Sequence, residues 1–335
     1  MTDRVGFFDA YDDVLTPLFT ASNVLQLISG AERSGLLQAL REPRPLEALV
    51  ETTSLPPSSV ATVCRALVTT GVVRQSGLEF VLTESWLALT DPGAYVPLGA
   101  AISGNAVEGR SLRAASGSTY WSMSSEDRLA YARAVSPDPF SDDLVEIFRR
   151  QIEGDPNRRA MLDGGRLLEL GCGLAGRVLT TLRAAPKLHA VGVELSEDLA
   201  EAARGRAANL GLSDRFVVEC VDASDYRADA PFDFGFWSQF FFPSSARAGA
   251  LATLMQSLRS GGVLLAPLGG EYVDLSVDSS SAAARDFAMW RVLLDSWGVP
   301  ERSPADLVAE LEGAGFTDVR VTEGNGPPLV RATRP

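Results

Sequence analysis

The spacing of apolar and polar positions predicts two kinds of structure along the chain. Between residues 58 and 70, apolar side chains recur at intervals of three and four, which is typical of a helix with one buried face. Two short apolar runs follow, residues 72–74 and 78–82, and Ser76-Gly77 between them predicts a hairpin. Together with the helical pattern from residue 23 onward, these elements predict a winged-helix unit in the first hundred residues.

Further along the chain, short apolar runs alternate with helical segments. The runs cover residues 167–170, 189–194, 216–221, 231–239 and 260–267. Strands that alternate with helices are typical of an α/β domain with a largely parallel sheet. Near the end, residues 311–321 are typical of a helix that glycine stops and a strand follows.

The first of these runs leads directly into a glycine turn. Gly171 and Gly173 follow the apolar strand, and an amphipathic helix comes next. Glycine adopts backbone conformations closed to other residues and lets a ligand lie against bare main chain, and the first turn of a helix offers unpaired N–H groups. The stretch therefore predicts a nucleotide-binding site.

Carboxylates around the turn bear on which nucleotide it binds. Glu169 lies two residues before the first glycine and can reach a cationic ligand. Glu194 ends the next run, where an acid accepts hydrogen bonds from ribose hydroxyls, and Asp222 ends the third, where it can accept from an adenine amino group. Glycines 171, 173 and 176 also satisfy G-x-G-x-x-G, so an NAD-dependent reductase stays open as an alternative.

The arrangement of an acid at the end of each of three successive strands resembles that of the class I S-adenosylmethionine (SAM) methyltransferases. The ligand of that family carries an ammonium, a ribose and an adenine. The resemblance covers roughly Leu167 to the C-terminus and departs from the usual E-x-G-x-G-x-G at Ala175. It implies a Rossmann-like seven-stranded sheet and SAM as cofactor. The cofactor contacts that it implies are Glu169, Gly171, Gly173, Glu194, Leu195, Asp222, Ala223, Trp237 and Ser238.

The N-terminal unit resembles the dimerisation domain of the plant-and-bacterial O-methyltransferases, whose early helices pack against a second subunit. This implies a homodimer and three regions: a winged-helix dimerisation domain (1–100), a helical linker that covers cofactor and substrate (101–155), and a SAM-binding catalytic domain (156–335). A winged-helix regulator that senses a nucleotide is an alternative. Arg65 is the one cation between Ser58 and Thr70, which disfavours DNA recognition.

The composition limits the classes of partner that we expect this protein to bind. The formal net charge of −13 disfavours a nucleic-acid polymer, because phosphates are held by concentrated Lys and Arg. No apolar run reaches the ~18 residues of a membrane span, and Met1 to Arg4 lack the pattern of a secretion signal. The 3 cysteines are far apart, which is typical of reduced thiols. We therefore expect a cytoplasmic protein with a small-molecule substrate and neither nucleic-acid nor membrane partners.

Methyl transfer from a sulfonium needs mainly alignment and exclusion of water. The plant-and-bacterial O-methyltransferases usually add a histidine base after the fourth strand, but residues 237–243 contain none, and the single histidine, His189, opens the second strand. The same stretch offers no carboxylate for a metal, so no metal is expected. This slightly favours C- or N-methylation over O-methylation and leaves Glu271 or Tyr272 as the candidate proton acceptor.

Aromatic residues near the strand ends predict a pocket for a flat apolar acceptor. We expect the enzyme to methylate a small aromatic or heteroaromatic natural-product intermediate, with Arg285 or Arg291 as the anchor for a carboxylate of the acceptor. A SAM-binding enzyme that catalyses a decarboxylation or rearrangement without methyl transfer is the main alternative. The predicted pocket residues are Tyr120, Trp121, Gln239, Phe240, Trp290 and Arg291.

Overall fold

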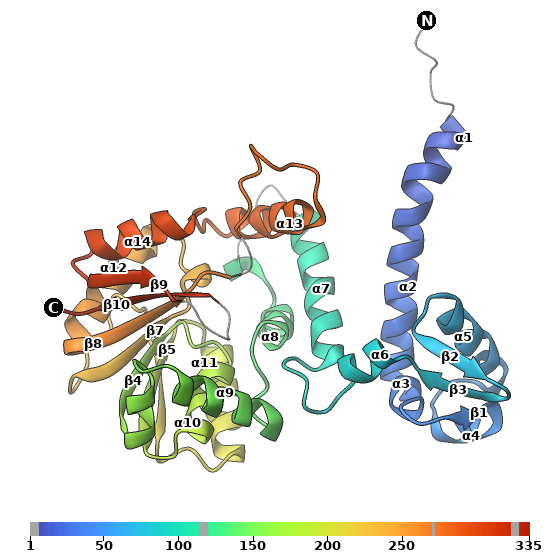
Figure 1. The fold of residues 1–335 in the computed structure, drawn as a ribbon, viewed down its shortest axis with the longest axis horizontal. Coiled ribbons are helices and arrows are strands. Elements are labelled where there is room, and N and C mark those ends of the chain that lie inside the picture. Colours follow the sequence, from blue (N-terminus) through green and yellow to red (C-terminus); the bar gives the residue numbers. More distant parts are fainter. Residues whose placement is uncertain (1–6, 114–119, 270–271, 323–327) are drawn as a thin grey trace, which may run out of the picture. The chain divides into compact units, whose positions relative to one another are not determined.

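The structure is a computed structural model that describes residues 7–113, 120–269, 272–322 and 328–335. Contacts between Cα atoms divide the chain into two compact units, Met1–Ser103 and Gly104–Pro335. Helix α7 (Leu98–Arg113) crosses this division (Figure 1).

The N-terminal unit is mostly helical and carries a small antiparallel sheet. The helix predicted over residues 58–70 is α5, which starts at a proline, a residue suited to the first turn of a helix. The predicted hairpin consists of β2 and β3, and the strand order is β1-β3-β2. The elements are α1 (Phe7–Ala10), the π-helix η1 (Tyr11–Leu15), α2 (Thr16–Arg33), α3 (Leu36–Ala39), β1 (Arg44–Pro45), α4 (Leu46–Thr52), α5 (Pro57–Thr69), β2 (Val73–Ser76), β3 (Glu79–Leu82) and α6 (Glu84–Leu89).

The core of this unit forms around α5. Val60, Cys64 and Leu67 recur at helical spacing and are buried against Leu37 and Leu49 of the neighbouring helices. The periodic stripe of the sequence is therefore the face that packs. The apolar area that it removes from water stabilises the unit by roughly 25 cal/mol for each Å².

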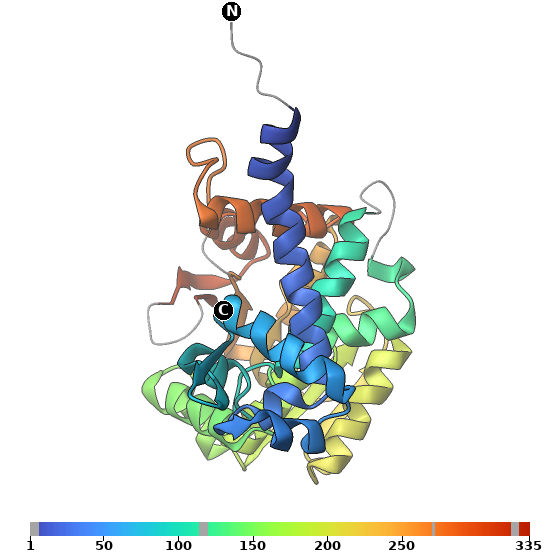
Figure 2. The same ribbon diagram turned by 90° about the vertical axis from the view of Figure 1, so that its right-hand side faces the viewer.

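The helical segment from α1 to α2, residues 7–33, forms one long continuous helix (Figure 2). Its last turns bury Ile28 and Ala31, whereas Phe8, Leu18 and Phe19 are exposed. The helix Phe8–Arg33 contains an 18-residue window with a mean hydropathy of 1.2 and is, by length and composition, able to cross a membrane. This finding corrects the expectation that no segment reaches that length. Core helices of soluble proteins and signal sequences share these properties, so they are weak evidence for a membrane span.

The second unit begins with helices that precede the sheet. These are the end of α7, the short 3₁₀ helix η2 (Tyr120–Ser122), α8 (Ser125–Ala134), α9 (Asp142–Gly154) and the 3₁₀ helix η3 (Arg159–Asp163). Ser124 and Ser141 cap α8 and α9, since each hydroxyl accepts a hydrogen bond from a backbone N–H in the first turn. Residues 120–154 therefore form defined helical elements ahead of the sheet.

The predicted seven-stranded sheet follows, and its strands lie in the order β6-β5-β4-β7-β8-β10-β9. The strands from β4 to β8 pair in parallel, and β10 pairs antiparallel with both β8 and β9. The strands are β4 (Gly165–Leu170), β5 (Leu188–Glu194), β6 (Phe216–Cys220), β7 (Phe232–Trp237), β8 (Leu258–Pro267), β9 (Thr317–Val321) and β10 (Leu329–Thr333). The helices between them are α10 (Gly176–Ala184), α11 (Glu197–Asn209), η4 (Gln239–Phe241), α12 (Ser244–Ser257), α13 (Ala282–Ser296) and α14 (Pro304–Gly313).

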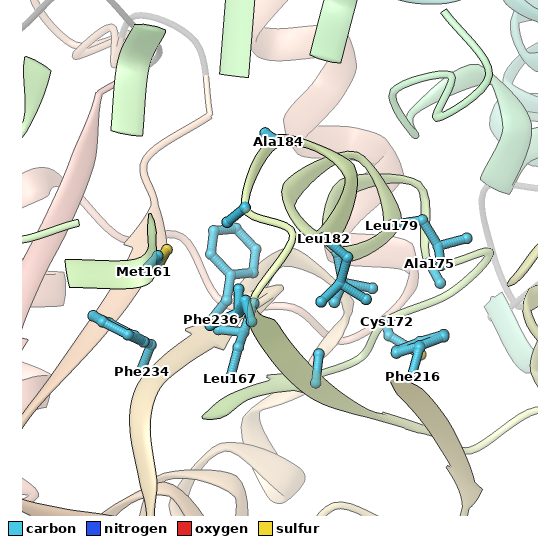
Figure 3. Close-up of a cluster of buried hydrophobic side chains, with 14 of the residues drawn as sticks. Met161, Leu167, Cys172, Ala175, Leu179, Leu182, Ala184, Phe216, Phe234 and Phe236 are labelled. Atoms are coloured by element: carbon cyan, nitrogen blue, oxygen red, sulfur yellow. The ribbon is translucent and has the colours of Figure 1, made fainter. Parts of the chain in front are cut away.

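The sheet separates two hydrophobic clusters, because successive side chains of a strand point to opposite faces. Leu168 and Leu170 of β4 belong to the cluster that includes α12 and α14, whereas Leu167 packs with residues of α9 and α10. Figure 3 shows Leu179 and Leu182 of α10 directed toward the strands of this second cluster. Strand β4 lies between β5 and β7, so the strand order reverses there, and such switch points create ligand crevices at the carboxyl ends of strands.

Gly176, the first residue of α10, allows the turn between α8 and α9 to pack closely against it. A Cβ at this position would overlap the hydroxyl of Ser136 and the carbonyl oxygen of Pro137. The last glycine of the G-x-G-x-x-G pattern therefore serves close packing of the turn at residues 136–137. This packing holds the helices before the sheet against the start of α10.

We predict that Gly176→Ala lowers the free energy of unfolding by about 1–3 kcal/mol, because a methyl group must displace backbone at this position. Urea denaturation measures the change. Gly205→Ala is the matched control: Gly205 lies in helix α11 with no described atom within 4 Å of its added Cβ. This control should raise stability by about 1 kcal/mol through helix propensity. Equal stability of Gly176→Ala and wild type would contradict the packing argument.

Candidate functional site

The turn after β4 has the backbone that the glycines predicted. Gly171 and Gly173 have φ angles of 72° and 53°, in the left-handed region that favours glycine. A Cβ at Gly171 would lie 2.9 Å from the ring of Phe242, while no described atom lies within 4 Å of a Cβ at Gly173. Ala175 also has a positive φ of 57°, so the chain accepts some strain at the position where the pattern usually has glycine. Gly173 therefore presents bare main chain to open space.

Glu194 joins this turn to the end of β5. Its carboxylate is 6% exposed and accepts hydrogen bonds from the N–H groups of Gly173 (2.8 Å) and Ser196 (2.9 Å). Burial raises the pKa of the carboxyl, and the backbone hydrogen bonds partly oppose that rise. Each carboxylate oxygen has a second lone pair, so Glu194 is able to accept further hydrogen bonds from ribose hydroxyls beside Gly173.

Glu169 lies on the other side of the turn, on the face of β4 that packs against α10. Its side chain is buried at 3% exposure, and its Oε2 has no hydrogen-bond partner among the described residues. Burial raises the pKa of Glu169 to about 8, against the lowering effect of the Arg177 charge. Burial therefore favours the protonated form of this carboxyl. Its predicted contact with a cationic ligand stays a prediction.

The carboxyl of Glu169 borders a small cavity. The cavity volume is about 20 Å³, room for roughly one water molecule. Arg177 also borders it, with its guanidinium 3.8 Å from the ring centre of Phe236. The remaining lining residues are Phe148, Ile152, Arg158, Met161, Leu167, Thr181 and Leu265.

The other predicted cofactor residues on this edge end β5 and β6. Asp222 accepts two hydrogen bonds from Ser224 through one carboxylate oxygen, from the backbone N–H at 2.8 Å and from the hydroxyl at 2.7 Å. Leu195 is exposed directly after Glu194. Ala223 is half-buried, and its carbonyl accepts a hydrogen bond from Thr253. Since parallel strands end at one edge, these residues share the edge of the sheet that carries the glycine turn.

Ser238 and Trp237 differ in their surroundings although they are adjacent. The backbone N–H of Ser238 donates to the carbonyl of Leu170, so Ser238 lies beside the glycine turn. Trp237 is fully buried in the core, and the guanidinium of Arg247 lies 4.5 Å from its ring centre. The structure therefore brings Ser238 to the predicted site and places the Trp237 ring below it.

Gln239 is held by a buried polar network. Its amide donates to the carbonyl of Pro267 (3.1 Å), and its side-chain and backbone oxygens accept from Arg247. Arg247 also forms an ion pair with Glu310, with N–O distances of 2.6 and 2.7 Å. All the polar atoms of the Gln239 side chain thus take part in fixing the loop after β7. Its predicted contact with a substrate stays a prediction.

Aromatic side chains from several elements form a cluster that we call the aromatic cluster: Tyr120, Tyr131, Phe241 and Trp297. Tyr120 packs edge-on against Trp297 at 5.2 Å and Phe241 at 5.7 Å, and Tyr131 lies 5.2 Å from Trp297. Burial raises the pKa of Tyr120, and the charge of Glu194 raises it further. Leu174 of the glycine turn packs in the same hydrophobic cluster, so the aromatic rings lie beside that turn.

Of the other predicted pocket residues, three extend the aromatic surface. Trp121 packs edge-on against Tyr120 at 5.1 Å and is partly exposed. Phe240 and Trp290 contact each other at 4.9 Å. Tyr131 was missed by sequence analysis, because its place in α8 carries no motif. The apolar positions of that helix are the one signal that could have found it.

Glu301, which sequence analysis did not single out, binds two of the predicted residues. The Tyr272 hydroxyl donates to Glu301 at 3.1 Å, and the Arg291 Nε lies 3.8 Å from the other carboxylate oxygen. Desolvation and the Glu301 charge raise the pKa of Tyr272, so its phenol keeps the proton at neutral pH. Glu271 lies outside the described residues. The catalytic roles proposed for Glu271 and Tyr272 stay predictions.

Comparisons with known proteins agree with this geometry. Residues 167–262 match the family model described as a methyltransferase domain. Mitomycin 7-O-methyltransferase MmcR superposes with a TM-score of 0.68 at 20% identity, covering 97% of this chain and 98% of its own. Human N-acetylserotonin methyltransferase in complex with SAM gives 0.69 at 13% identity, covering 100% and 99%. CalO1, a methyltransferase in calicheamicin biosynthesis with SAH bound, gives 0.67 at 16% identity, covering 99% and 100%.

No match was found among curated protein sequences. Residues 167–262 form a methyltransferase domain, so the chain is an enzyme that uses SAM, and its fold over nearly the whole length is that of the methyltransferases named above. The predicted α/β fold, enzyme class and cofactor are thereby confirmed. The site fits that cofactor, because Gly173 offers open main chain beside the acceptor oxygens of Glu194. The NAD-dependent reductase finds no support in the matched domain.

We predict that Glu194→Ala weakens the binding of S-adenosylhomocysteine (SAH) by about tenfold to a hundredfold, the loss expected for hydrogen bonds to a charged group. The protein should still fold, with a free energy of unfolding lower by about 1–3 kcal/mol, because the N–H groups of Gly173 and Ser196 lose their acceptor. Calorimetric titration and urea denaturation measure the two effects. Glu197→Ala, at an exposed acid in the first turn of α11, is the control. Unchanged affinity of Glu194→Ala would mean that the ribose lies elsewhere.

Proposed function

We propose that this protein transfers the methyl group of SAM to a small aromatic or heteroaromatic natural-product intermediate. One observation carries the proposal: Leu174, in the glycine turn that Glu194 binds, packs in the same hydrophobic cluster as Tyr120 and Trp297. A donor held by Glu194 and a flat acceptor held by aromatic rings would then lie close together. Two structural relatives, named for mitomycin and for calicheamicin biosynthesis, support a natural-product acceptor.

We further propose that carbon or nitrogen is methylated in preference to a phenolic oxygen. Residues 237–243 contain no histidine to remove a phenolic proton. The phenol of Tyr272 has a raised pKa, which makes it a poor base near neutral pH. An acceptor that is already nucleophilic needs no such base, and alignment with exclusion of water would supply most of the catalysis.

The alternative is an enzyme that binds SAM but catalyses a decarboxylation or rearrangement. It shares the cofactor site, so binding experiments do not separate it from the proposed transferase. The release of SAH separates the two, because methyl transfer consumes the sulfonium and the alternative reaction leaves it intact.

The test has two stages. Calorimetry with SAM and SAH should detect binding in well-folded protein, whereas NADH should give neither heat nor a rise in melting temperature. Aromatic amines, electron-rich arenes and matched phenols are then incubated with methyl-labelled SAM, and labelled product and SAH are quantified. Equal amounts of both, with amine or carbon acceptors ahead of phenols, are expected. Turnover of an acceptor with intact SAM would favour the alternative, and faster labelling of phenols would overturn the preference for carbon or nitrogen.

We also propose that the protein acts in the cytoplasm as a homodimer through its N-terminal unit, which we interpret as a winged-helix dimerisation domain. The support is the apolar surface of the long N-terminal helix, where Phe8, Leu15, Leu18 and Phe19 are exposed within the described structure. Contiguous exposed apolar surface of this kind marks an interaction site. Arg65 remains the one cation of the α5 segment, which argues against DNA as the partner.

We predict that wild type elutes with twice the mass of one chain in light scattering and that Leu18→Glu shifts it to the monomer, because a carboxylate would be buried at the interface. Leu78→Glu replaces a leucine that is also exposed, in the turn between β2 and β3, and should leave the dimer intact. A monomeric wild type would refute the dimer. Recovery of wild type with membrane vesicles would instead favour a membrane role for the helix at residues 8–33.

A further inference from the structure

Helix α8 is tied to helix α11 by a partly buried ion pair. Arg128 of α8 donates to Asp198 of α11 through Nη2 at 2.8 Å and through Nε at 3.2 Å. The two side chains are 14% and 19% exposed. Two charge-assisted hydrogen bonds from one guanidinium to one carboxylate fix the orientation of both groups, which an exposed pair does not achieve.

On the Asp198 side of this ion pair, hydrogen bonds continue to Glu194, the acid at the glycine turn. The hydroxyl of Ser196 donates to Asp198, and the backbone N–H of the same serine donates to Glu194 at 2.9 Å. Asp198 also accepts from the N–H of Leu199 at 2.9 Å. The position of Arg128 is thus connected through two residues to the carboxylate that we assign to the ribose.

On the Arg128 side of the ion pair, a hydrogen bond reaches the turn next to the aromatic cluster. Arg128 donates to the carbonyl of Met123 at 3.1 Å, which fixes the turn between η2 and α8. Tyr120 lies just before this turn, and Tyr131 lies three residues after Arg128 on the same helix. Both tyrosines pack on Trp297 at 5.2 Å. The orientation of Arg128 therefore influences two of the four rings in the cluster.

We propose that Arg128 is a positioning residue that couples the cofactor site to the acceptor chamber. Its pair with Asp198 holds α8 and the aromatic cluster against the end of β5, so that binding at Glu194 and ordering of α8 favour each other. The coupling works in both directions, since a contact that stabilises one arrangement of two sites raises the affinity at each. This inference rests on the proposed function, because it takes Glu194 as the ribose acid and the aromatic rings as the acceptor wall.

Apolar contacts between α8 and α11 remain when the ion pair is removed. Leu129 and Ala130 of α8 pack in the same hydrophobic cluster as Leu199 and Ala202 of α11. Substitution of Arg128 should therefore preserve the fold and weaken the coupling. This separates a positioning role from a purely structural one.

Hydrogen exchange with and without SAH tests the proposal. In wild type, saturating SAH should slow exchange of the amides in residues 125–134 by about tenfold, the change that corresponds to one charge-assisted hydrogen bond. In Arg128→Gln this slowing should be lost although SAH still binds, and Arg128→Lys should restore part of it. Asp198→Asn removes the same pair from the other side and should reproduce Arg128→Gln.

The matched control is Arg110→Gln. Arg110 pairs with Asp127, the residue next to Arg128, but this pair is more exposed, at 47% and 29%. Among the described residues no chain of hydrogen bonds joins this pair to Glu194, so Arg110→Gln should keep the wild-type response to SAH. The coupling would be overturned if SAH slowed amide exchange in Arg128→Gln or Asp198→Asn as much as in wild type. It would also be overturned if bound SAH did not slow amide exchange in wild type. Failure of wild type to bind SAH at all would instead refute the proposed function.

Discussion

The structure of the site depends on one buried carboxylate. Glu194 accepts hydrogen bonds from Gly173 in one turn and from Ser196 in the next, and so it joins the ends of two neighbouring strands. Without an acceptor, these N–H groups would be buried unpaired, at a cost of about 1–3 kcal/mol. The same acid has lone pairs left for a ligand. We propose that the side chain that shapes the glycine turn also recognises the cofactor.

Close packing and a few hydrogen-bonded ion pairs position the segments around Glu194. Gly176 allows the turn at residues 136–137 to approach α10, and Arg128 connects α8 to α11. Arg247 fixes the loop after β7 by binding Gln239 and Glu310. The packing at Gly176, the Arg128–Asp198 pair and the Arg247–Glu310 pair each join segments that are far apart in sequence.

The N-terminal unit uses its apolar surface in two different ways. Around α5 the apolar stripe is buried within the unit, as its spacing predicted. On the long N-terminal helix, apolar side chains are equally frequent but largely exposed. Periodicity identifies an apolar face without identifying what covers it. The helix at residues 8–33 therefore has three chemically reasonable environments, a second subunit, a membrane and a core, and only the first agrees with the proposed homodimer.

The sequence by itself determined the local structure and the class of chemistry. A strand, Gly171, Gly173 and a helix require only local backbone preferences, and acids at strand ends follow from the apolar runs that precede them. The tertiary structure decided which predicted side chains are open to a ligand. Glu169 lies under α10, Trp237 lies in the core, Gln239 is bound by Arg247, and Arg291 lies beside Glu301. These outcomes depend on how the elements pack in three dimensions, and spacing along a chain carries no information about which side chain will satisfy a buried polar group.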